Sequence, residues 1–168
     1  LPGIFLGLYL GIDFSLIKQE ISRLRPLPRT MDPARTTKGT ILINDTYNTN
    51  LNSIRRAVEY VKLYRGKRIL VLEPLIELGK NAFQDHLELG KEIGKVCDYL
   101  FLTNDNYYEP LLTGVKSQKS LCIVQVLPPA KIAKFVDRST QSPAVVVFEG
   151  REAYNSFSLI AAEPVLRV

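Results

Sequence analysis

Short, continuously apolar runs recur along the chain and are separated by polar stretches. Each run is rich in β-branched and aliphatic side chains, which is the pattern of a strand buried on both faces of a sheet. The predicted strands cover residues 40–43, 69–72, 99–102, 121–124 and 144–148.

Between these strands, apolar residues recur at the three-to-four spacing of an amphipathic helix. The clearest case is residues 51–64, where Ile54, Ala57, Val58 and Val61 share one face. We expect Ser15 to cap the first helix of the chain and Asn52 or Ser53 to cap the second, because such side chains accept bonds from free backbone N–H groups. The predicted helices cover residues 15–24, 51–64, 82–96, 109–112 and 129–136.

The regular exchange of strand and helix predicts an α/β fold. We expect a Rossmann-like, mostly parallel sheet with helices on both faces. Right-handed crossovers then place the loops that follow the strands at one edge, where ligands of such sheets bind. The proline-containing stretch 25–39 cannot continue the preceding helix, so we interpret it as a connector and a domain boundary.

Length and composition suit one globular domain that buries a core. The chain has 168 residues, of which 46% are hydrophobic and 23% charged. No apolar run approaches the roughly 18 residues that a membrane span needs, and the opening residues lack the basic segment and cleavage site of a signal peptide. The chain starts without Met, inside a stretch with a helical pattern, so we expect it to be a fragment of a longer protein.

Charge limits the kinds of partner that we expect, and cysteine content indicates the redox environment. The net charge of +5 comes from scattered Lys and Arg residues that rarely lie beside paired aromatic residues, so we predict neither a nucleic-acid groove nor a membrane partner. Cys97 and Cys122 are too few for a disulfide framework, and we expect both to be buried small hydrophobic residues. A reducing, cytoplasmic environment follows as an expectation.

The loop after the first predicted strand carries the densest polar chemistry. Residues 44–53 hold one carboxylate, Asp45, beside Tyr47, Asn48 and Asn50. A carboxylate at a strand end can accept bonds from the hydroxyls of a ribose, and the amides suit a peptide substrate. The alternative is a polar loop that only caps the next helix.

The order of residues in this loop resembles a motif of the Mur ligases. Asp45-x-Tyr47-Asn48-x-Asn50, followed by Ser53, is similar to the family's D-x-Y-N-A-N-P-x-S stretch. Residues 68–79, 83–90 and 10–13 with 27–29 resemble its following and preceding segments, so that the resemblance covers about residues 1–103. Within the family, the motifs are most similar to those of ligases that add D-alanyl-D-alanine to UDP-N-acetylmuramoyl-tripeptide.

The resemblance implies roles for particular residues. Asp45 would face the ribose of ATP and Arg29 the nucleotide, while an arginine that only packs in the connector is the alternative for Arg29. Tyr47, Asn48 and Asn50 would form a polar wall for the acceptor. His86 and Glu77 would also contact substrate, against the alternatives of a packing histidine and a solvated helix cap. Residues 1–30 would be the end of the central domain with its connector, and residues 31–168 the C-terminal domain.

The same resemblance implies the cofactors and partners. The family uses ATP and Mg²⁺ to activate a carboxylate as an acyl phosphate, which the incoming amine then displaces. The expected partners are ATP, a UDP-linked muramoyl peptide, D-alanyl-D-alanine and the central ATPase domain of the same parent chain. This sequence has no P-loop, since its nearest approach at residues 90–96 ends in Val. We therefore expect the phosphate and metal sites in the central domain and no activity from this chain alone.

Departures from the family pattern leave two alternatives open. Leu51 replaces a proline, Glu73-Pro74 replaces Gly-Asp, and residues 149–152 read Glu-Gly-Arg-Glu where the family has Lys-Gly-Ser-Arg. One alternative is a Mur ligase that adds a diamino acid or lysine, because residues 103–106 superficially resemble its acceptor loop. The other is a non-catalytic remnant that keeps the fold as a binding domain.

Overall fold

A twisted sheet forms the centre of the protein in the computed structural model, which describes residues 2–24, 27–76, 78–138, 143–162 and 165–167. Its seven strands lie in the order β5-β4-β3-β6-β2-β1-β7. The pairs β2–β6, β6–β3, β3–β4 and β4–β5 are parallel, whereas β1 is antiparallel to both β2 and β7. The strands are β1 (Asp32–Thr36), β2 (Ile41–Asp45), β3 (Lys67–Leu72), β4 (Tyr99–Leu102), β5 (Ile123–Val126), β6 (Ala144–Glu149) and β7 (Val165–Arg167).

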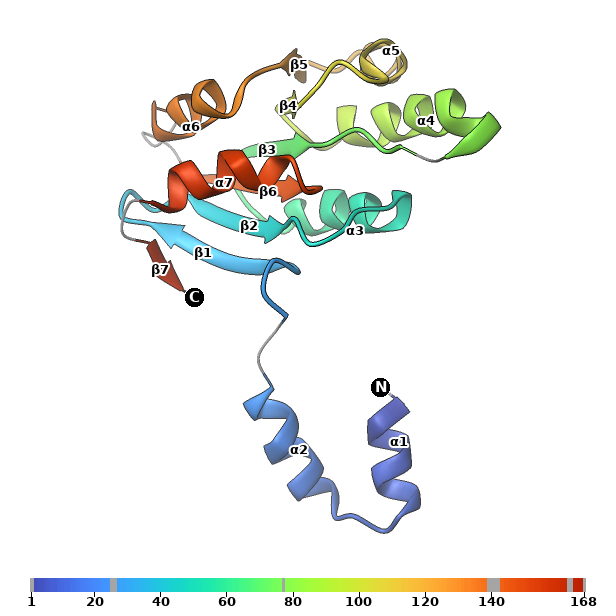
Figure 1. The fold of residues 1–168 in the computed structure, drawn as a ribbon, viewed down its shortest axis with the longest axis vertical. Coiled ribbons are helices and arrows are strands. Elements are labelled where there is room, and N and C mark those ends of the chain that lie inside the picture. Colours follow the sequence, from blue (N-terminus) through green and yellow to red (C-terminus); the bar gives the residue numbers. More distant parts are fainter. Residues whose placement is uncertain (1, 25–26, 77, 139–142, 163–164, 168) are drawn as a thin grey trace.

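Helices cover both faces of this sheet (Figure 1). One core cluster joins α3, α4 and α5 to one face, and a second joins α6 and α7 to the other. The side chains of the central strands alternate between the two clusters and are almost fully buried. The predicted α/β fold with a mostly parallel sheet is therefore confirmed. The helices are α1 (Pro2–Tyr9), α2 (Phe14–Arg23), α3 (Leu51–Val61), α4 (Ala82–Gly94), α5 (Tyr108–Ser117), α6 (Pro129–Arg138) and α7 (Ala153–Ala161).

The sheet holds two strands that the apolar pattern does not predict. β1 (Asp32–Thr36) lies within the predicted connector and contains Pro33 and charged residues, which are unusual in a strand. It forms because β2 and β7 supply hydrogen-bonding partners on its two sides, and this tertiary pairing overrides a weak local preference. The predicted elements also end at residue 148, whereas α7 and β7 follow.

The predicted short helix at 109–112 is wrong in extent, because α5 runs from Tyr108 to Ser117. Gly114 lies inside it, where glycine normally weakens a helix. A Cβ on Gly114 would meet the carbonyl oxygen of Leu87 at 2.2 Å, and one on Gly90 would meet that of Leu111 at 2.4 Å. These glycines thus allow α4 and α5 to cross in close contact.

Two predicted helix caps are also wrong by a few residues. Asp13, not Ser15, caps α2, because its side chain accepts the backbone N–H of Ser15. Asn50, not Asn52 or Ser53, caps α3. In both cases the acceptor lies two residues before an N–H that it binds, and Asn50 also accepts the N–H of Ser53, three residues on, which is the geometry of a capping side chain.

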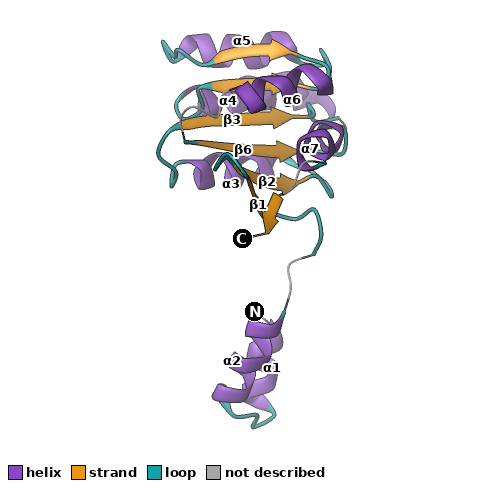
Figure 2. Ribbon diagram, turned by 90° about the vertical axis from the view of Figure 1, so that its left-hand side faces the viewer, coloured by secondary structure: helices purple, strands orange, loops and turns teal. Residues whose placement is uncertain are grey.

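The helical pair α1–α2 lies away from the sheet, beyond the connector (Figures 1 and 2). No residue of this pair belongs to either core cluster. Large apolar side chains are exposed on it, among them Phe5, Leu10 and Phe14. In the described part of the chain, no helix combines the length and the apolar character needed to cross a membrane.

Both cysteines are free thiols. Cys97 is buried, as predicted, while Cys122 is only half-buried. Burial raises the pKa of the Cys97 thiol far above its usual range, and it raises the pKa of Cys122 to about 12. Neither thiol therefore carries the thiolate character of a reactive cysteine.

Candidate functional site

Polar residues gather where the parallel strands end. Asp45 ends β2 and Glu149 ends β6, and the two are direct partners in the register of these parallel strands. Glu73 follows β3 and donates its backbone N–H to the carbonyl oxygen of Glu149. The loops that the sequence places after the strands therefore meet at one edge of the sheet, as the crossover rule requires.

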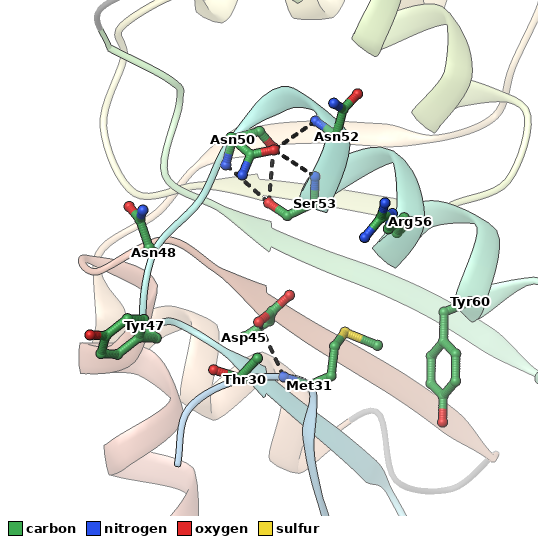
Figure 3. A pocket seen from close by; sticks show the side chains of 10 residues that line it. All are labelled: Thr30, Met31, Asp45, Tyr47, Asn48, Asn50, Asn52, Ser53, Arg56 and Tyr60. Carbon is green, nitrogen blue, oxygen red and sulfur yellow. Dashed lines mark hydrogen bonds between the residues drawn. The ribbon is translucent and has the colours of Figure 1, made fainter. Parts of the chain in front are cut away.

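A cavity of about 630 Å³ opens at this edge, between the connector and the start of α3 (Figure 3). The Asp45 carboxylate lies near its centre, with Tyr47 and Asn48 to one side and Arg56 with Tyr60 to the other. We call this hollow the Asp45 cavity. Its lining residues are Thr30, Met31, Asp45, Tyr47, Asn48, Asn50, Asn52, Ser53, Arg56 and Tyr60.

Asp45 is largely covered, with 7% of its surface exposed, but it still lines the Asp45 cavity. One of its oxygens accepts the backbone N–H of Met31 at 3.1 Å. The backbone N–H of Tyr47 in turn donates to the carbonyl oxygen of Arg29 at 3.0 Å. The connector is thus bonded directly to the loop that carries Asp45. A carboxylate has further lone pairs beyond the one used here, so Asp45 can still accept ligand hydroxyls.

The three predicted acceptor residues take different positions. Tyr47 is 66% exposed and Asn48 is also exposed, so both side chains are accessible. Asn50 has a structural duty, because its Oδ1 accepts the backbone N–H groups of Asn52 and Ser53, each at 3.0 Å. The alternative of a helix-capping loop therefore holds for Asn50, which also lines the Asp45 cavity.

The side chain of Arg29 is held against the loop after β2 and against α7. Its Nε donates to Thr46 Oγ1 at 2.9 Å and its terminal nitrogen to the Thr46 carbonyl oxygen at 2.7 Å. Its guanidinium carbon also lies 4.2 Å from the ring centroid of Tyr154. The backbone of Arg29 has a φ of 64°, a strained value for a side-chain-bearing residue that this set of contacts holds in place. Contact of Arg29 with nucleotide remains a prediction.

His86 is buried, with 1% of its surface exposed. Its Nε2 accepts the backbone N–H of Leu75 at 3.1 Å, its Nδ1 lies 2.6 Å from the carbonyl oxygen of Ala82, and its ring stacks on Tyr107 at 4.0 Å. Desolvation by burial lowers its pKa, so the neutral ring that this bonding needs is favoured. This placement supports the packing alternative, with His86 holding the loop at Leu75. Glu77 lies outside the described residues.

Glu149 lies beside Asp45 at the sheet edge, and the sequence indicates it only as a departure from the family motif. It is fully buried, and Thr49 Oγ1 donates to its Oε2 at 3.1 Å. Its Oε1 has no hydrogen-bond donor within the described part of the chain. Desolvation first, and then the neighbouring Asp45 carboxylate, raise the pKa of Glu149 to about 9. Glu149 therefore keeps its proton at neutral pH and is uncharged beside Asp45.

The other departures form one bonded network. Glu73 Oε2 accepts the backbone N–H of Glu152, just before α7, at 3.0 Å. Glu152 Oε2 accepts from Thr103 Oγ1 and from Asn104 Nδ2, each at 2.7 Å. Three loops at the carboxyl edge are therefore joined by side chains that satisfy one another. Among the described residues, no three His, Cys, Asp or Glu side chains are grouped so that they could hold a metal ion.

Comparison with known proteins identifies the relatives of this chain. Residues 31–153 match the family described as Mur ligase, glutamate ligase domain. UDP-N-acetylmuramoyl-tripeptide–D-alanyl-D-alanine ligase of Escherichia coli is 28% identical over 86 residues, which are 51% of this chain and 19% of that protein. The Haemophilus influenzae ligase of the same name is 30% identical over 99 residues, 56% of this chain and 22% of that protein. The chain thus spans about a fifth of the length of these curated relatives.

Two solved structures of MurF ligases are also similar to this chain. MurF ligase of Thermotoga maritima, solved in complex with ADP, superimposes with a TM-score of 0.72 at 25% identity over 95% of this chain and 36% of that one. MurF of Acinetobacter baumannii superimposes with a TM-score of 0.73 at 20% identity, covering 93% of this chain and 34% of that one, and shows the shared fold. The family match covers most of the sheet and its helices. The chain therefore belongs to the Mur ligase family, with its glutamate ligase domain over residues 31–153.

Proposed function

We propose that this chain is the C-terminal part of an ATP-dependent ligase that adds D-alanyl-D-alanine to UDP-N-acetylmuramoyl-tripeptide in peptidoglycan synthesis. The observation that carries the proposal is the Asp45 cavity, in which a carboxylate at the end of β2 lies beside an exposed phenol and amide. The curated relatives with this activity support the choice of acceptor, and the ADP in the T. maritima relative supports a nucleotide partner.

In this proposal the domain positions reactants and does not activate phosphate itself. ATP and Mg²⁺ would be held mainly by the central domain of the parent chain, with Asp45 accepting hydrogen bonds from the ribose. The amine of the acceptor would displace phosphate from an acyl phosphate, forming the amide bond and releasing a proton. Tyr47 and Asn48 would orient the acceptor, and positioning of this kind lowers the barrier by holding the reactants close.

The proposed boundary falls at the connector, with residues 1–30 as the end of the central domain. The family match begins at residue 31, and α1–α2 shares no core cluster with the sheet. Bonds from Arg29 and Met31 to the Asp45 loop would then link domain closure to nucleotide binding.

The ligase that adds lysine or a diamino acid is the less favoured alternative. Its acceptor loop needs an arginine to grip a carboxylate, and Tyr107-Tyr108 stand at that place in this chain. Tyr107 stacks on His86 and Tyr108 packs against the core, so neither provides an equivalent group. The remnant alternative is also less favoured, because the altered loops form the satisfied network of Glu73 and Glu152.

Replacing Asp45 in the parent ligase tests the proposal. We expect Asp45→Ala to raise the KM for ATP by about 10- to 100-fold, the loss of charged hydrogen bonds to a ligand. The measurement is the rate of phosphate release against ATP concentration, with D-alanyl-D-alanine as acceptor. Glu59→Gln, which changes an exposed acid on α3, is the control. An unchanged KM for ATP in Asp45→Ala contradicts the ribose role, and an upstream gene region without an in-frame P-loop domain favours the remnant.

A further inference from the structure

A second cavity of about 560 Å³ lies beside the Asp45 cavity and shares Tyr47 and Asn48 with it. Its other lining residues are Arg29, Arg151 and Tyr154. We call it the arginine cavity. Two guanidinium groups, two phenols and an amide line it, with no carboxylate among the lining residues. This composition provides hydrogen-bond donors and positive charge, and it selects an anionic group.

Arg29 provides a fixed positive charge at this cavity. The two bonds to Thr46 and the ring of Tyr154 hold its guanidinium in one position. Because this side chain is ordered before any ligand arrives, it contributes charge without a further loss of rotamer freedom. However, its Nε and one terminal nitrogen already donate to Thr46. A second group is therefore needed to bind an anion through two parallel hydrogen bonds.

Arg151 is that second group. It is exposed in the loop between β6 and α7, and its side chain makes no hydrogen bond or ion pair in the part of the chain that is described. The two neighbouring acids, Glu152 and Glu73, have hydrogen-bond partners other than Arg151. Glu152 accepts a hydrogen bond from Thr103, and Glu73 accepts the backbone N–H of Glu152. The positive φ of Gly150, 93°, sets the turn that presents Arg151 at the edge. The guanidinium is thus available to a ligand.

We propose that the arginine cavity binds the free carboxylate of the acceptor dipeptide and that Arg151 is the specificity-determining residue that grips it. The inference rests on the proposed function and names a subsite within it. A guanidinium matches a carboxylate with two parallel hydrogen bonds. Asn48 borders the Asp45 cavity, the arginine cavity and a third hollow beside Glu73, so its amide is placed to bind the peptide group next to that carboxylate.

The test compares the acceptor with a form that lacks the charge. In the parent ligase, initial rates are measured with D-alanyl-D-alanine and with its C-terminal amide, for the wild type, Arg151→Gln and Arg151→Lys. We expect Arg151→Gln to raise the KM for the dipeptide by about 10- to 100-fold, with Arg151→Lys in between and the KM for ATP unchanged.

The wild type should bind the amide form poorly, and Arg151→Gln should no longer distinguish the two forms. Arg65→Gln, an exposed arginine in the loop before β3 at the opposite edge of the sheet, should behave like the wild type.

Three other outcomes would each contradict the carboxylate subsite or the proposed function. A rise in the KM for ATP alone would assign the arginine cavity to a nucleotide phosphate and overturn the carboxylate subsite. An equal loss with both forms of the dipeptide would also overturn it, because the effect would then not depend on the carboxylate. A wild type that ligates a different amino acid would refute the proposed function alone, and the same comparison with that amino acid and its amide would still decide the subsite.

Discussion

Glu149 is a buried acid whose surroundings favour its protonated form. Asp45 lies beside it across the parallel strands, and Thr49 donates to one of its oxygens. The sequence alone shows only that a glutamate stands where the family motif has a lysine. The structure shows that burial beside Asp45 favours the protonated, uncharged form of Glu149.

This arrangement predicts that stability depends on pH. The folded Glu149 keeps its proton up to about pH 9, whereas its usual pKa is 4.5. The free energy of unfolding should therefore be highest, as far as this group is concerned, below pH 4.5 and should fall as the pH rises to 9. We expect Glu149→Gln, which keeps the shape and a donor, to be more stable than the wild type at pH 8 by on the order of a few kcal/mol.

Urea unfolding at pH 5, 7 and 9 measures this difference. The gap between the two proteins should be small at pH 5 and should widen at each step. Glu88→Gln, which changes an acid on the surface of α4, is a control that should leave the pH profile of the wild type nearly intact. A constant gap across the three pH values would contradict the raised pKa of Glu149.

At the scale of elements, the start of α3 combines a structural and a functional loop. Asn50 and Ser53 cap each other reciprocally, since Ser53 Oγ accepts the backbone N–H of Asn50 at 3.0 Å. This capping box fixes the direction in which the chain leaves Tyr47 and Asn48. The positions of Tyr47 and Asn48 thus depend on a cap formed by Asn50, the third residue predicted for the acceptor wall.

We expect Asn50→Ala to lower the free energy of unfolding by about 0.5–2 kcal/mol, the usual cost of losing such a cap. Urea unfolding followed by circular dichroism measures it. Asn52→Ala is the matched control, because Asn52 is exposed and contributes only its backbone N–H to the cap. Equal losses in both variants would mean that the Asn50 side chain does not stabilise α3.

The sequence predicts the inner part of the sheet well, because β2, β3, β4 and β6 are apolar runs that burial on both faces requires. It places the edge strand β5 (Ile123–Val126) two residues too early, because this strand is mostly exposed and lacks the pattern of a buried strand. It does not predict β1, whose local preference is weak and whose formation depends on pairing with distant β7. It also does not show that Arg29 is bound to Tyr154, because 125 positions separate these residues in the chain. The position of Asp45 at the edge of the sheet follows from its place after a strand, whereas the surroundings of Glu149 depend on a neighbour across the sheet.

At the scale of the whole molecule, two parts share few contacts. The sheet and helices α3–α7 hold both core clusters, and α1–α2 holds neither. The apolar side chains exposed on α1–α2, such as Phe5 and Phe14, contrast with the buried core of the sheet. This division supports a boundary in the connector.

A chain without residues 1–24 should therefore unfold at the same urea concentration as the full chain, with free energies that agree within about 0.5 kcal/mol. It should also bind less of a dye that fluoresces on exposed apolar surface, because Phe5 and Phe14 are removed. Ile54→Ala, which empties a fully buried position in α3, is the comparison and should cost about 2–5 kcal/mol. A large loss of stability in the shortened chain would show that α1–α2 is part of the folding unit.

The close approach of Gly150 and Glu73 limits how this edge of the protein can be redesigned. A methyl group on Gly150 would lie 2.5 Å from Glu73 Cβ and 2.7 Å from its Oε2, so the two loops are shaped to each other. Grafting the Lys-Gly-Ser-Arg segment of a relative onto residues 149–152 alone would remove the Glu152 carboxylate that binds Thr103 and Asn104 and would place a lysine against Asp45. An exchange of recognition loops between Mur ligases would have to move the segments after β3 and β6 together, as one cassette.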